Sequence, residues 1–349
     1  MPTSVWDSVL TEFNTAVVRE MQQRQLQPNT PIRASWSLLI ESKIKRVFER
    51  TGIPLIIYGC ACTAAPGKVQ PHLLQIDASD KIGFHSMLEA VDGPKLDVLV
   101  HSPGGFAEAT ETIVEEIRRK FGYVRFIVPS YAKSAATMMV MAGDEILIDE
   151  DGELGPIDPQ MLTANGVTPA EAIKDQFQKA HDEIKDDPKK MQVWFPILQA
   201  LGGGILVQCD NAILLSKELV AKWLAQYMFR ADPDRTAKAQ KVADYLGTHA
   251  NFKTHGRRVK LEHLLPLDLR VQNLRADADL YARIWELHCA LDIILANTPI
   301  YKIFYNSAGA GMVRQQAVQQ GIQLRLQQPP VLPQAAPSPA IPVPLPGPT

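Results

Sequence analysis

The stretch from Leu96 to Gln160 decides the fold of this chain, and it reads LDVLVHSPGGFAEATETIVEEIRRKFGYVRFIVPSYAKSAATMMVMAGDEILIDEDGELGPIDPQ. It contains three short apolar segments, at residues 96–101, 123–128 and 146–148. The segments between them carry apolar residues at helical spacing, such as Ile113 and Ile117. Buried strands that alternate with helices are typical of βαβ units. The stretch therefore predicts a parallel sheet with helices packed on it.

Two junctions between a strand and a helix carry residues suited to catalysis. Gly104 and Gly105 follow the first apolar segment, where glycine lets backbone N–H groups point into a cleft. Ser134 stands at the next junction, where the positive end of a helix dipole stabilises nearby negative charge. Because adjacent crossovers of one sheet bring their loops together, a serine nucleophile would face a backbone oxyanion hole. Taken singly, a glycine pair is more often a plain turn, and such a serine is more often an N-cap.

Beyond these junctions, the stretch resembles a known group of peptidases. Ser102-Pro103-Gly104-Gly105 is followed by the helix start Ala-Lys-Ser-Ala-Ala, and then by the segments 142–146 and 155–160. Over residues 80–160 these motifs resemble the clan of ClpP and signal peptide peptidase A, and within it the serine dehydrogenase proteinase group. The resemblance implies an α/β fold, with a ClpP/crotonase-like ββα spiral core and helical N- and C-terminal additions.

The same resemblance implies roles for the matching positions. Ser134 matches the nucleophile of a serine peptidase that hydrolyses peptide bonds through an acyl-enzyme, either without ATP or with an adaptor. Gly104, Gly105 and Ala135 match the oxyanion hole. Related proteins form rings, so a homo-oligomer and a peptide or protein substrate are expected.

The base that would activate the serine is not where ClpP carries its histidine, because residues 158–160 read Asp-Pro-Gln. The serine dehydrogenase proteinase group is described with a triad in the order Ser, Asp, His. By this resemblance His255 is the candidate base, and His249 is the second choice. The acid of the triad would be one of two residues near predicted strand ends, Asp144 or Asp158.

A Ser-Lys dyad, as in signal peptide peptidase A, is the alternative. A catalytic lysine must be desolvated to lower its pKa. Lys217 lies in the most apolar predicted helix and is the best candidate, whereas Lys174 and Lys179 lie on a charged helix. Lys133 neighbours Ser134 but would point about 100° away on the helix, so it is a poor base.

Composition restricts the classes of function. The net charge is −2 and 21% of residues are charged, so no strong attraction to nucleic acid or to an anionic membrane is expected. Of the four cysteines only Cys60 and Cys62 lie close together, so we expect no metal site and no cofactor. Residues 1–12 lack the apolar region of a signal peptide, and no apolar run could span a bilayer. A cytoplasmic protein is expected.

Four segments divide the chain. Residues 1–50 read as a helical segment, 51–165 as the ClpP/crotonase-like catalytic core, and 166–310 as a helical region that completes the fold. Residues 327–349 hold nine prolines and no charge, which predicts a disordered, extended tail. Such a tail could also bind an aromatic groove of a partner.

Two other functions fit the same motifs. A chain that kept the fold but lost its base would be a non-catalytic scaffold that binds partners. A crotonase-like acyl-CoA enzyme would share the oxyanion geometry, but it has no need of a serine at the second helix start. Labelling of Ser134 by a covalent serine probe would separate the peptidase from the scaffold.

Overall fold

The structure is a computed structural model that describes residues 4–24, 35–64, 67–164 and 166–316. The chain separates into a unit of residues 1–316 and a second unit of residues 317–349. The tail predicted for residues 327–349 lies outside the described residues.

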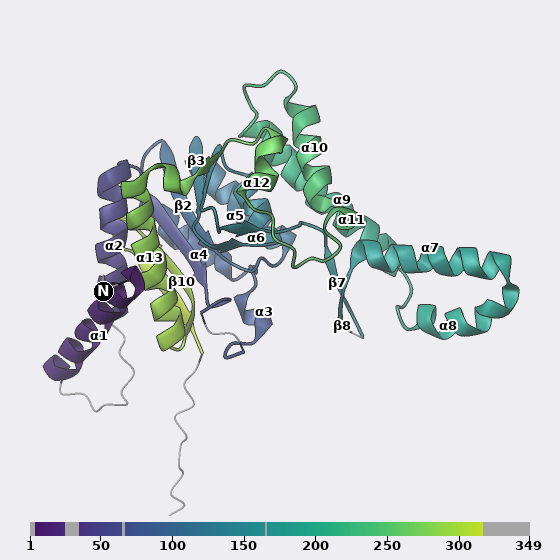
Figure 1. Ribbon diagram of the computed structural model, residues 1–349, viewed down its shortest axis with the longest axis horizontal. Helices are drawn as coiled ribbons and strands as arrows, with labels where there is room; N and C mark the ends of the chain where they lie inside the picture. The colour runs from purple at the N-terminus through teal and green to yellow at the C-terminus, as the bar shows by residue number, and fades with distance from the viewer. Residues whose placement is uncertain (1–3, 25–34, 65–66, 165, 317–349) are drawn as a thin grey trace, which may run out of the picture. The chain divides into compact units, whose positions relative to one another are not determined.

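A seven-stranded sheet forms the centre of the first unit, in the order β11-β10-β1-β2-β3-β5-β9 (Figure 1). Within this sheet, β1, β2, β3, β5 and β9 run parallel to one another. β10 is antiparallel to both β1 and β11. This confirms the predicted α/β class and its parallel sheet. The strands span β1 (Leu55–Cys60), β2 (Lys95–His101), β3 (Tyr123–Val128), β5 (Glu145–Ile148), β9 (Val271–Asn273), β10 (Ile300–Asn306) and β11 (Gly311–Gln315).

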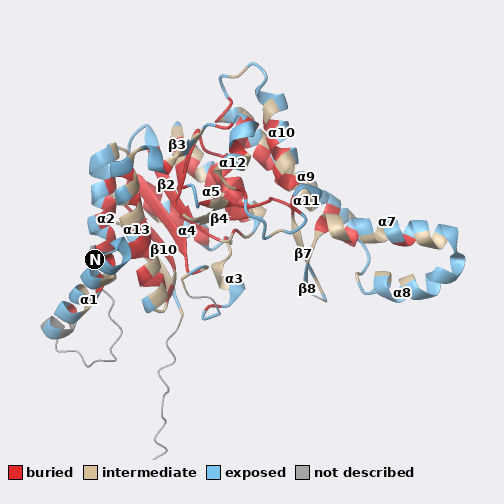
Figure 2. Ribbon diagram, in the orientation of Figure 1, coloured by how far each residue is buried: buried red, intermediate tan, exposed pale blue. Residues whose placement is uncertain are grey.

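Both faces of the sheet are covered, which explains why its central strands are apolar without alternation. Along β1, Ile56 and Tyr58 pack into one core, while Leu55 and Ile57 pack into the other. Figure 2 shows the buried sheet between helices whose outer surfaces are exposed. One core is covered by α4 (Asp80–Glu89), α5 (Ala107–Lys120), α6 (Ala135–Met141), α9 (Ile205–Gln226) and α10 (Arg235–Gly247), and the other by α1 (Val5–Arg24), α2 (Ser35–Thr51) and α13 (Ala278–Asn297).

Smaller elements connect these layers. Helix α7 (Ala170–Asp186) packs on α9 and contacts α8 (Met191–Gln199). A small apolar cluster that includes Ile173 and Cys209 lies between α7 and α9. The remaining helices are α3 (Pro71–Leu74), α7 (Ala170–Asp186), α8 (Met191–Gln199), α11 (His249–Phe252), α12 (Leu261–Leu264) and the 3-10 turns η1 (Pro188–Lys190), η2 (Leu265–Leu267) and η3 (Leu274–Ala276). The remaining strands form the pairs β4 (Tyr131–Ala132) with β6 (Glu153–Leu154) and β7 (Gln160–Thr163) with β8 (Gly166–Pro169).

The sequence did not lead us to expect strands after residue 160. Strands β8, β9 and β10 all lie in the region 166–310 that was expected to be helical. β9 is three residues long, and β10 carries a lysine in the middle of its apolar run. Neither gives the continuous apolar pattern of a buried parallel strand, and their places in the sheet depend on distant partners.

Candidate active site

Ser134 sits in a backbone conformation that is rare for any residue other than glycine. Its φ of 51° and ψ of −123° lie just before α6, at the end of the short strand β4. The Gly104 backbone packs closely against Ser134. A Cβ on Gly104 would lie 2.7 Å from the Ser134 Cβ and 2.4 Å from the Lys133 carbonyl oxygen. Only a glycine fits there, and its φ of 92° requires one as well.

The two predicted junctions therefore meet. The Ser102 N–H donates to the Tyr131 carbonyl at 2.9 Å, and the Lys133 N–H donates back to the Ser102 carbonyl at 3.0 Å. These bonds join the segment 102–106, which we call the glycine loop, to the strand that precedes Ser134.

Two backbone N–H groups near Ser134 have no hydrogen-bond partner among the described residues. Within the described part of the chain, neither the Gly105 N–H nor the Ala135 N–H finds a hydrogen-bond acceptor. Both residues line the same cavity as Ser134. The Gly104 N–H differs, because it donates to the Ser102 hydroxyl oxygen at 3.2 Å. Two of the three residues expected at the oxyanion hole thus offer a free donor.

Asp158 is held between two histidines. Its carboxylate is 2% exposed, with Oδ1 2.7 Å from His255 Nδ1 and Oδ2 2.9 Å from His249 Nδ1. The Gln160 amide donates to the same Oδ2 at 3.1 Å. Gln160 was not recognised as part of this cluster from the sequence, although it follows Asp158 by two residues.

Main-chain pairing explains how residues 97 positions apart meet here. The Leu154 N–H donates to the Val259 carbonyl at 2.9 Å, and the Val259 N–H donates back at 3.0 Å. The Ile157 N–H donates to the Leu246 carbonyl at 2.9 Å. The loop that carries Asp158 is thereby fixed against the segment that carries both histidines.

A cavity of about 880 Å³ joins these groups. Ser134, Gly105, Ala135 and His255 all line it. Its remaining wall is largely apolar, with Phe106, Met138, Ile157, Met161 and Leu215 among the contributors. A cavity of this volume and lining is typical of sites that bind extended organic ligands.

Other candidates from the sequence lie elsewhere. Asp144 is buried against Arg118, with Oδ2 2.7 Å from the guanidinium Nη1, and it accepts from the Val124 N–H. Its carboxylate is therefore committed to a structural ion pair, whereas Asp158 contacts His255. Lys217 pairs with Asp244 at 3.3 Å and is not among the residues that line the cavity.

The structure also argues against the other three lysines near the serine in sequence, Lys133, Lys174 and Lys179, as the base. Lys174 pairs with Asp210 at 2.6 Å at the surface. Lys179 does not line the cavity. Lys133 pairs with Glu153 at 2.9 Å, and burial lowers the pKa of its ammonium group.

The described residues hold no cluster of three or more side chains able to ligate a metal ion, and all four cysteines are free thiols. Among the described helices, none combines the length and the apolar character needed to cross a bilayer.

Comparison with known proteins finds relatives that are similar to about a third of the chain. Two uncharacterized proteins of Methanocaldococcus jannaschii, MJ1495 and MJ0137, are 31% and 34% identical to it over 114 residues. The matches cover 33% and 32% of this chain but only 37% and 38% of the relatives, well under half their length. A solved structure described as a membrane-bound stomatin-specific protease matches with a TM-score of 0.34 at 16% identity, over 56% of this chain and 74% of that one.

A family profile gives the boundaries. It describes ClpP-like SDH-type serine proteinases and matches residues 69–196. That range contains the glycine loop, Ser134 and Asp158, and it ends before both histidines. Over residues 69–196 this chain is therefore similar to the ClpP-like SDH-type serine proteinases.

Proposed function

We propose that this chain is a serine peptidase that cleaves peptide bonds through an acyl-enzyme on Ser134. One observation carries the proposal: the Ser134 side chain, the His255 ring held by Asp158, and the free N–H groups of Gly105 and Ala135 share one cavity. A nucleophile, an oriented base and a pair of oxyanion donors are the parts that acyl transfer needs.

The roles follow from the hydrogen bonds. Asp158 accepts the Nδ1–H of His255, which leaves the Nε2 lone pair of the ring free to take a proton. That nitrogen removes the hydroxyl proton as Ser134 Oγ attacks the substrate carbonyl. The Gly105 and Ala135 N–H groups stabilise the resulting oxyanion. Collapse breaks the C–N bond, and His255 returns its proton to the leaving amine.

Deacylation repeats the sequence with water. His255 takes a proton from water, the hydroxide oxygen attacks the ester, and the serine leaves with the proton from His255. In this scheme Gly104 supplies no third donor, because its N–H is bonded within the loop. Its role is to let the glycine loop approach Ser134.

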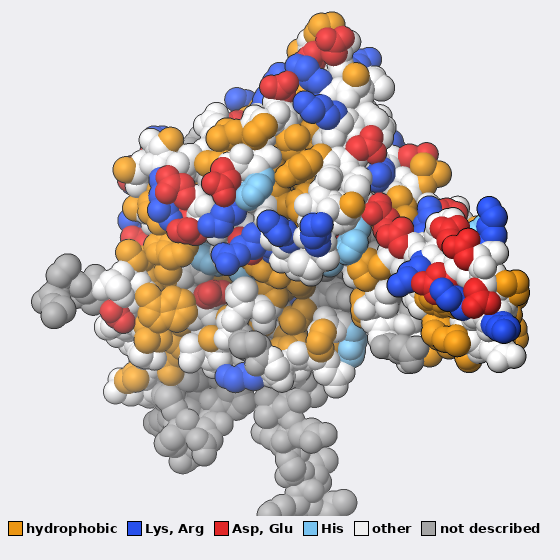
Figure 3. All heavy atoms as spheres, turned by 45° about the vertical axis from the view of Figure 1, so that its right-hand side comes forward, with side chains coloured by type: hydrophobic (Ala, Val, Ile, Leu, Met, Phe, Trp, Pro, Cys, Tyr) orange, Lys and Arg blue, Asp and Glu red, His pale blue; other side chains and the backbone are white. Residues whose placement is uncertain are grey.

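The partners expected from the sequence stay predictions. A peptide or protein substrate fits the size and the apolar lining of the cavity. Self-association and a cytoplasmic location rest on the resemblance and on composition, and light scattering of the purified chain tests the first. Positive and negative side chains are interspersed on the face in Figure 3, so this face offers no single-sign surface for nucleic acid.

Substitution at three positions tests the proposal. Ser134→Ala should abolish both casein hydrolysis and labelling by a fluorophosphonate probe, with an unchanged circular dichroism spectrum. His255→Ala should lower the labelling rate by about 10³-fold or more, on the scale of losing a triad base. Lys217→Ala is the matched control and should react as the wild type does.

Each outcome selects one reading. A dead Lys217→Ala variant beside an active His255→Ala variant would replace the triad by a Ser-Lys dyad. A folded wild type that neither labels nor hydrolyses would favour the scaffold.

A further inference from the structure

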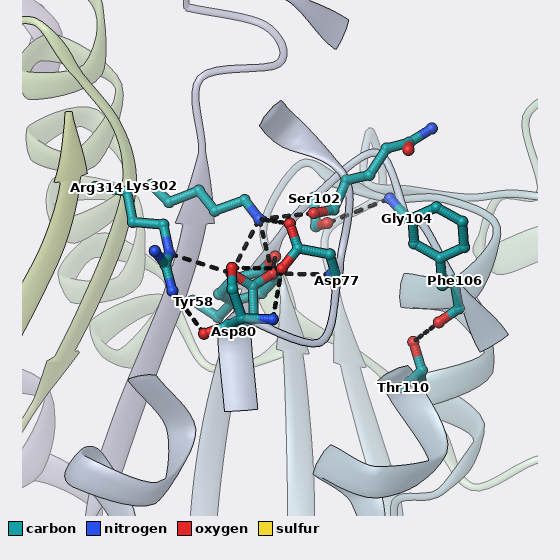
Figure 4. A network of polar contacts seen from close by, with 11 residues as sticks. Tyr58, Asp77, Asp80, Ser102, Gly104, Phe106, Thr110, Lys302 and Arg314 are labelled. Atoms are coloured by element: carbon teal, nitrogen blue, oxygen red, sulfur yellow. Dashed lines mark hydrogen bonds and ion pairs between the residues drawn. The ribbon is translucent and has the colours of Figure 1, made fainter. Parts of the chain in front are cut away.

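A buried ion pair lies beside the glycine loop (Figure 4). Lys302 on β10 and Asp80 at the start of α4 are both completely buried, and the Lys302 Nζ lies 2.9 and 2.7 Å from the two carboxylate oxygens. The Tyr58 hydroxyl donates to Asp80 at 2.8 Å, and Arg314 lies within 3.7 Å of it. Figure 4 shows these side chains pointing toward one another, beside Ser102 and Gly104.

The same ammonium group also binds the main chain. Lys302 Nζ donates to the Gln75 carbonyl oxygen at 2.6 Å. Gln75 is followed by Ile76, whose N–H donates to the Gly104 carbonyl at 2.8 Å. The Ile76 carbonyl in turn accepts from the Phe106 N–H at 2.9 Å. A short chain of contacts thus runs from Lys302 through residues 75 and 76 to both sides of Gly105.

Gly105 depends on this support because it has no side chain to hold it. A Cβ at Gly105 would lie 2.3 Å from both the N and the O of Ile76, so the two backbones are in direct contact. The Ile76 backbone therefore fixes the position of the peptide that presents the Gly105 N–H.

Burying Lys302 and Asp80 together is an inefficient way to stabilise the core. Burying two charges away from water often costs more than their attraction returns, so apolar replacements of similar volume are frequently as stable. An apolar pair, however, could not donate to the Gln75 carbonyl. What a long donor side chain at residue 302 supplies, and an apolar one cannot, is the bond to the segment that supports the glycine loop.

We propose that Lys302, paired with Asp80, is a positioning residue for the oxyanion donor on Gly105. The inference rests on the proposed function, since it assigns a purpose to a donor that matters only if Ser134 reacts. Lys302 touches no reacting atom. It acts through Gln75 and Ile76, which set where the Gly105 N–H points.

The test removes both charges together, so that neither is left buried alone. The variant is Lys302→Met with Asp80→Asn. Its matched control is Arg125→Met with Asp97→Asn, because Arg125 and the buried Asp97 form another ion pair in the same sheet, joined by bonds of 2.9 and 2.8 Å between β2 and β3. Any change in overall stability from removing two buried charges is shared by both double variants, which makes the control a measure of the structural effect alone.

Two readouts separate positioning from stability. The first is the maximal rate constant for phosphonylation of Ser134 by a fluorophosphonate probe, whose phosphoryl oxygen must enter the oxyanion hole. It should fall about 10- to 100-fold in the Lys302 and Asp80 variant, the scale of a misplaced catalytic group, and stay within about twofold in the control. The second is amide hydrogen exchange at Ile76 and Phe106, which should be faster in the first variant only.

The two proposals fail differently. If the wild type never reacts with the probe, the peptidase proposal falls, while hydrogen exchange still decides whether Lys302 fixes the loop. If the wild type reacts and the Lys302 and Asp80 variant matches it in both readouts, the positioning role is wrong. Should that variant not fold, Lys302→Gln with Asp80→Asn replaces it: the Gln side chain is one atom shorter than Lys, so its amide cannot reach the Gln75 carbonyl as Lys302 does, and a slower reaction than in the wild type is expected. An unchanged rate in that folded variant would overturn the inference equally.

Discussion

The backbone of Ser134 is held in a conformation that L-residues avoid. A non-glycine residue at its φ of 51° and ψ of −123° costs about 1–3 kcal/mol, which the surrounding packing must offset. Gly104 and the first turn of α6 supply that packing. In this conformation Ser134 lines the cavity.

We expect Ser134→Gly to be more stable than Ser134→Ala by about 1 kcal/mol. Both variants lose the hydroxyl, but only glycine relieves the backbone, and part of that gain is offset by the greater entropy of glycine in the unfolded chain. Urea unfolding of the two variants gives the difference directly. An alanine variant as stable as the glycine variant would show that the strain is absent.

A second residue-scale prediction concerns a partly buried carboxyl beside β2. Asp292 on α13 faces His101 at 3.8 Å, and burial raises the pKa of Asp292 to about 6. Burial also lowers the pKa of His101, so its neutral ring offers no compensating charge. Below about pH 4 the carboxyl is protonated in both states of the protein. Between about pH 4 and 6 it ionises only in the unfolded chain, so folding stability falls as the pH rises.

Asp292→Asn should therefore stabilise the protein at pH 8, by up to about 3 kcal/mol, and have no effect below about pH 4. The measurement is the free energy of unfolding of both proteins across this range. Buried His288, whose pKa is lowered to about 4 by burial, adds acid sensitivity of the opposite sign to both proteins, so it cancels in the difference. A difference that did not change with pH would contradict the assignment.

At the scale of elements, Arg118 on α5 ties together parts that are distant in sequence. Its guanidinium donates to the Ala142 carbonyl at the end of α6, pairs with Asp144, and stacks 3.8 Å from the Tyr227 ring that follows α9. The side chain is 3% exposed. Asp144, a candidate acid in the sequence, thus belongs to the junction of three elements.

Arg118→Met should lower the free energy of unfolding by about 3 kcal/mol, because it leaves the buried Asp144 with only the half-exposed Arg230 for compensation. Adding Asp144→Asn should recover part of the loss. A folded Asp144→Asn protein should also label at Ser134 as fast as the wild type. Slow labelling in that variant would return Asp144 to the list of catalytic candidates.

Elements built from local pattern could be predicted, and those built from distant pairing could not. β2, β3, β5 and the helices between them were predicted because continuous apolar runs alternate there with helical patterns, whereas the two-residue strand β4 was not. β10 was not, because Lys302 interrupts its pattern, yet a lysine inside an apolar run was itself a signal of a buried partner. That partner, Asp80, lies 222 residues away, and no spacing rule connects them.

The residues of the candidate site also fall into those that a local sequence pattern predicts and those that depend on distant pairing. Ser134 and the glycine loop follow from two strand ends that are neighbours in one sheet, so local reasoning reaches them. The contact between Asp158 and His255 depends on the pairing of Leu154 with Val259, which the sequence does not encode locally. Only the resemblance to the order of a known triad suggested this contact. Nothing in the sequence indicated that Asp158 would contact both His255 and His249 at once.

For the molecule as a whole, the central sheet is completed late in synthesis, because a strand inside it, β10, follows most of the other strands in the sequence. β10 lies between β1 and β11 and carries Lys302, so it leaves the ribosome long after β1, β2, β3 and β5. Until then β1 has an unpaired edge and Asp80 has no lysine. At about 5–20 residues per second, the interval between residues 134 and 302 is roughly 10–30 s.

A nascent chain stalled before β10 should therefore hold Ser134 without a settled oxyanion donor, and it should not react with a fluorophosphonate probe. Chains stalled after residues 300–315 have cleared the exit tunnel should react. The peptidase activity proposed above would then be silent while the chain is being made, so unfinished copies on neighbouring ribosomes would not be exposed to it.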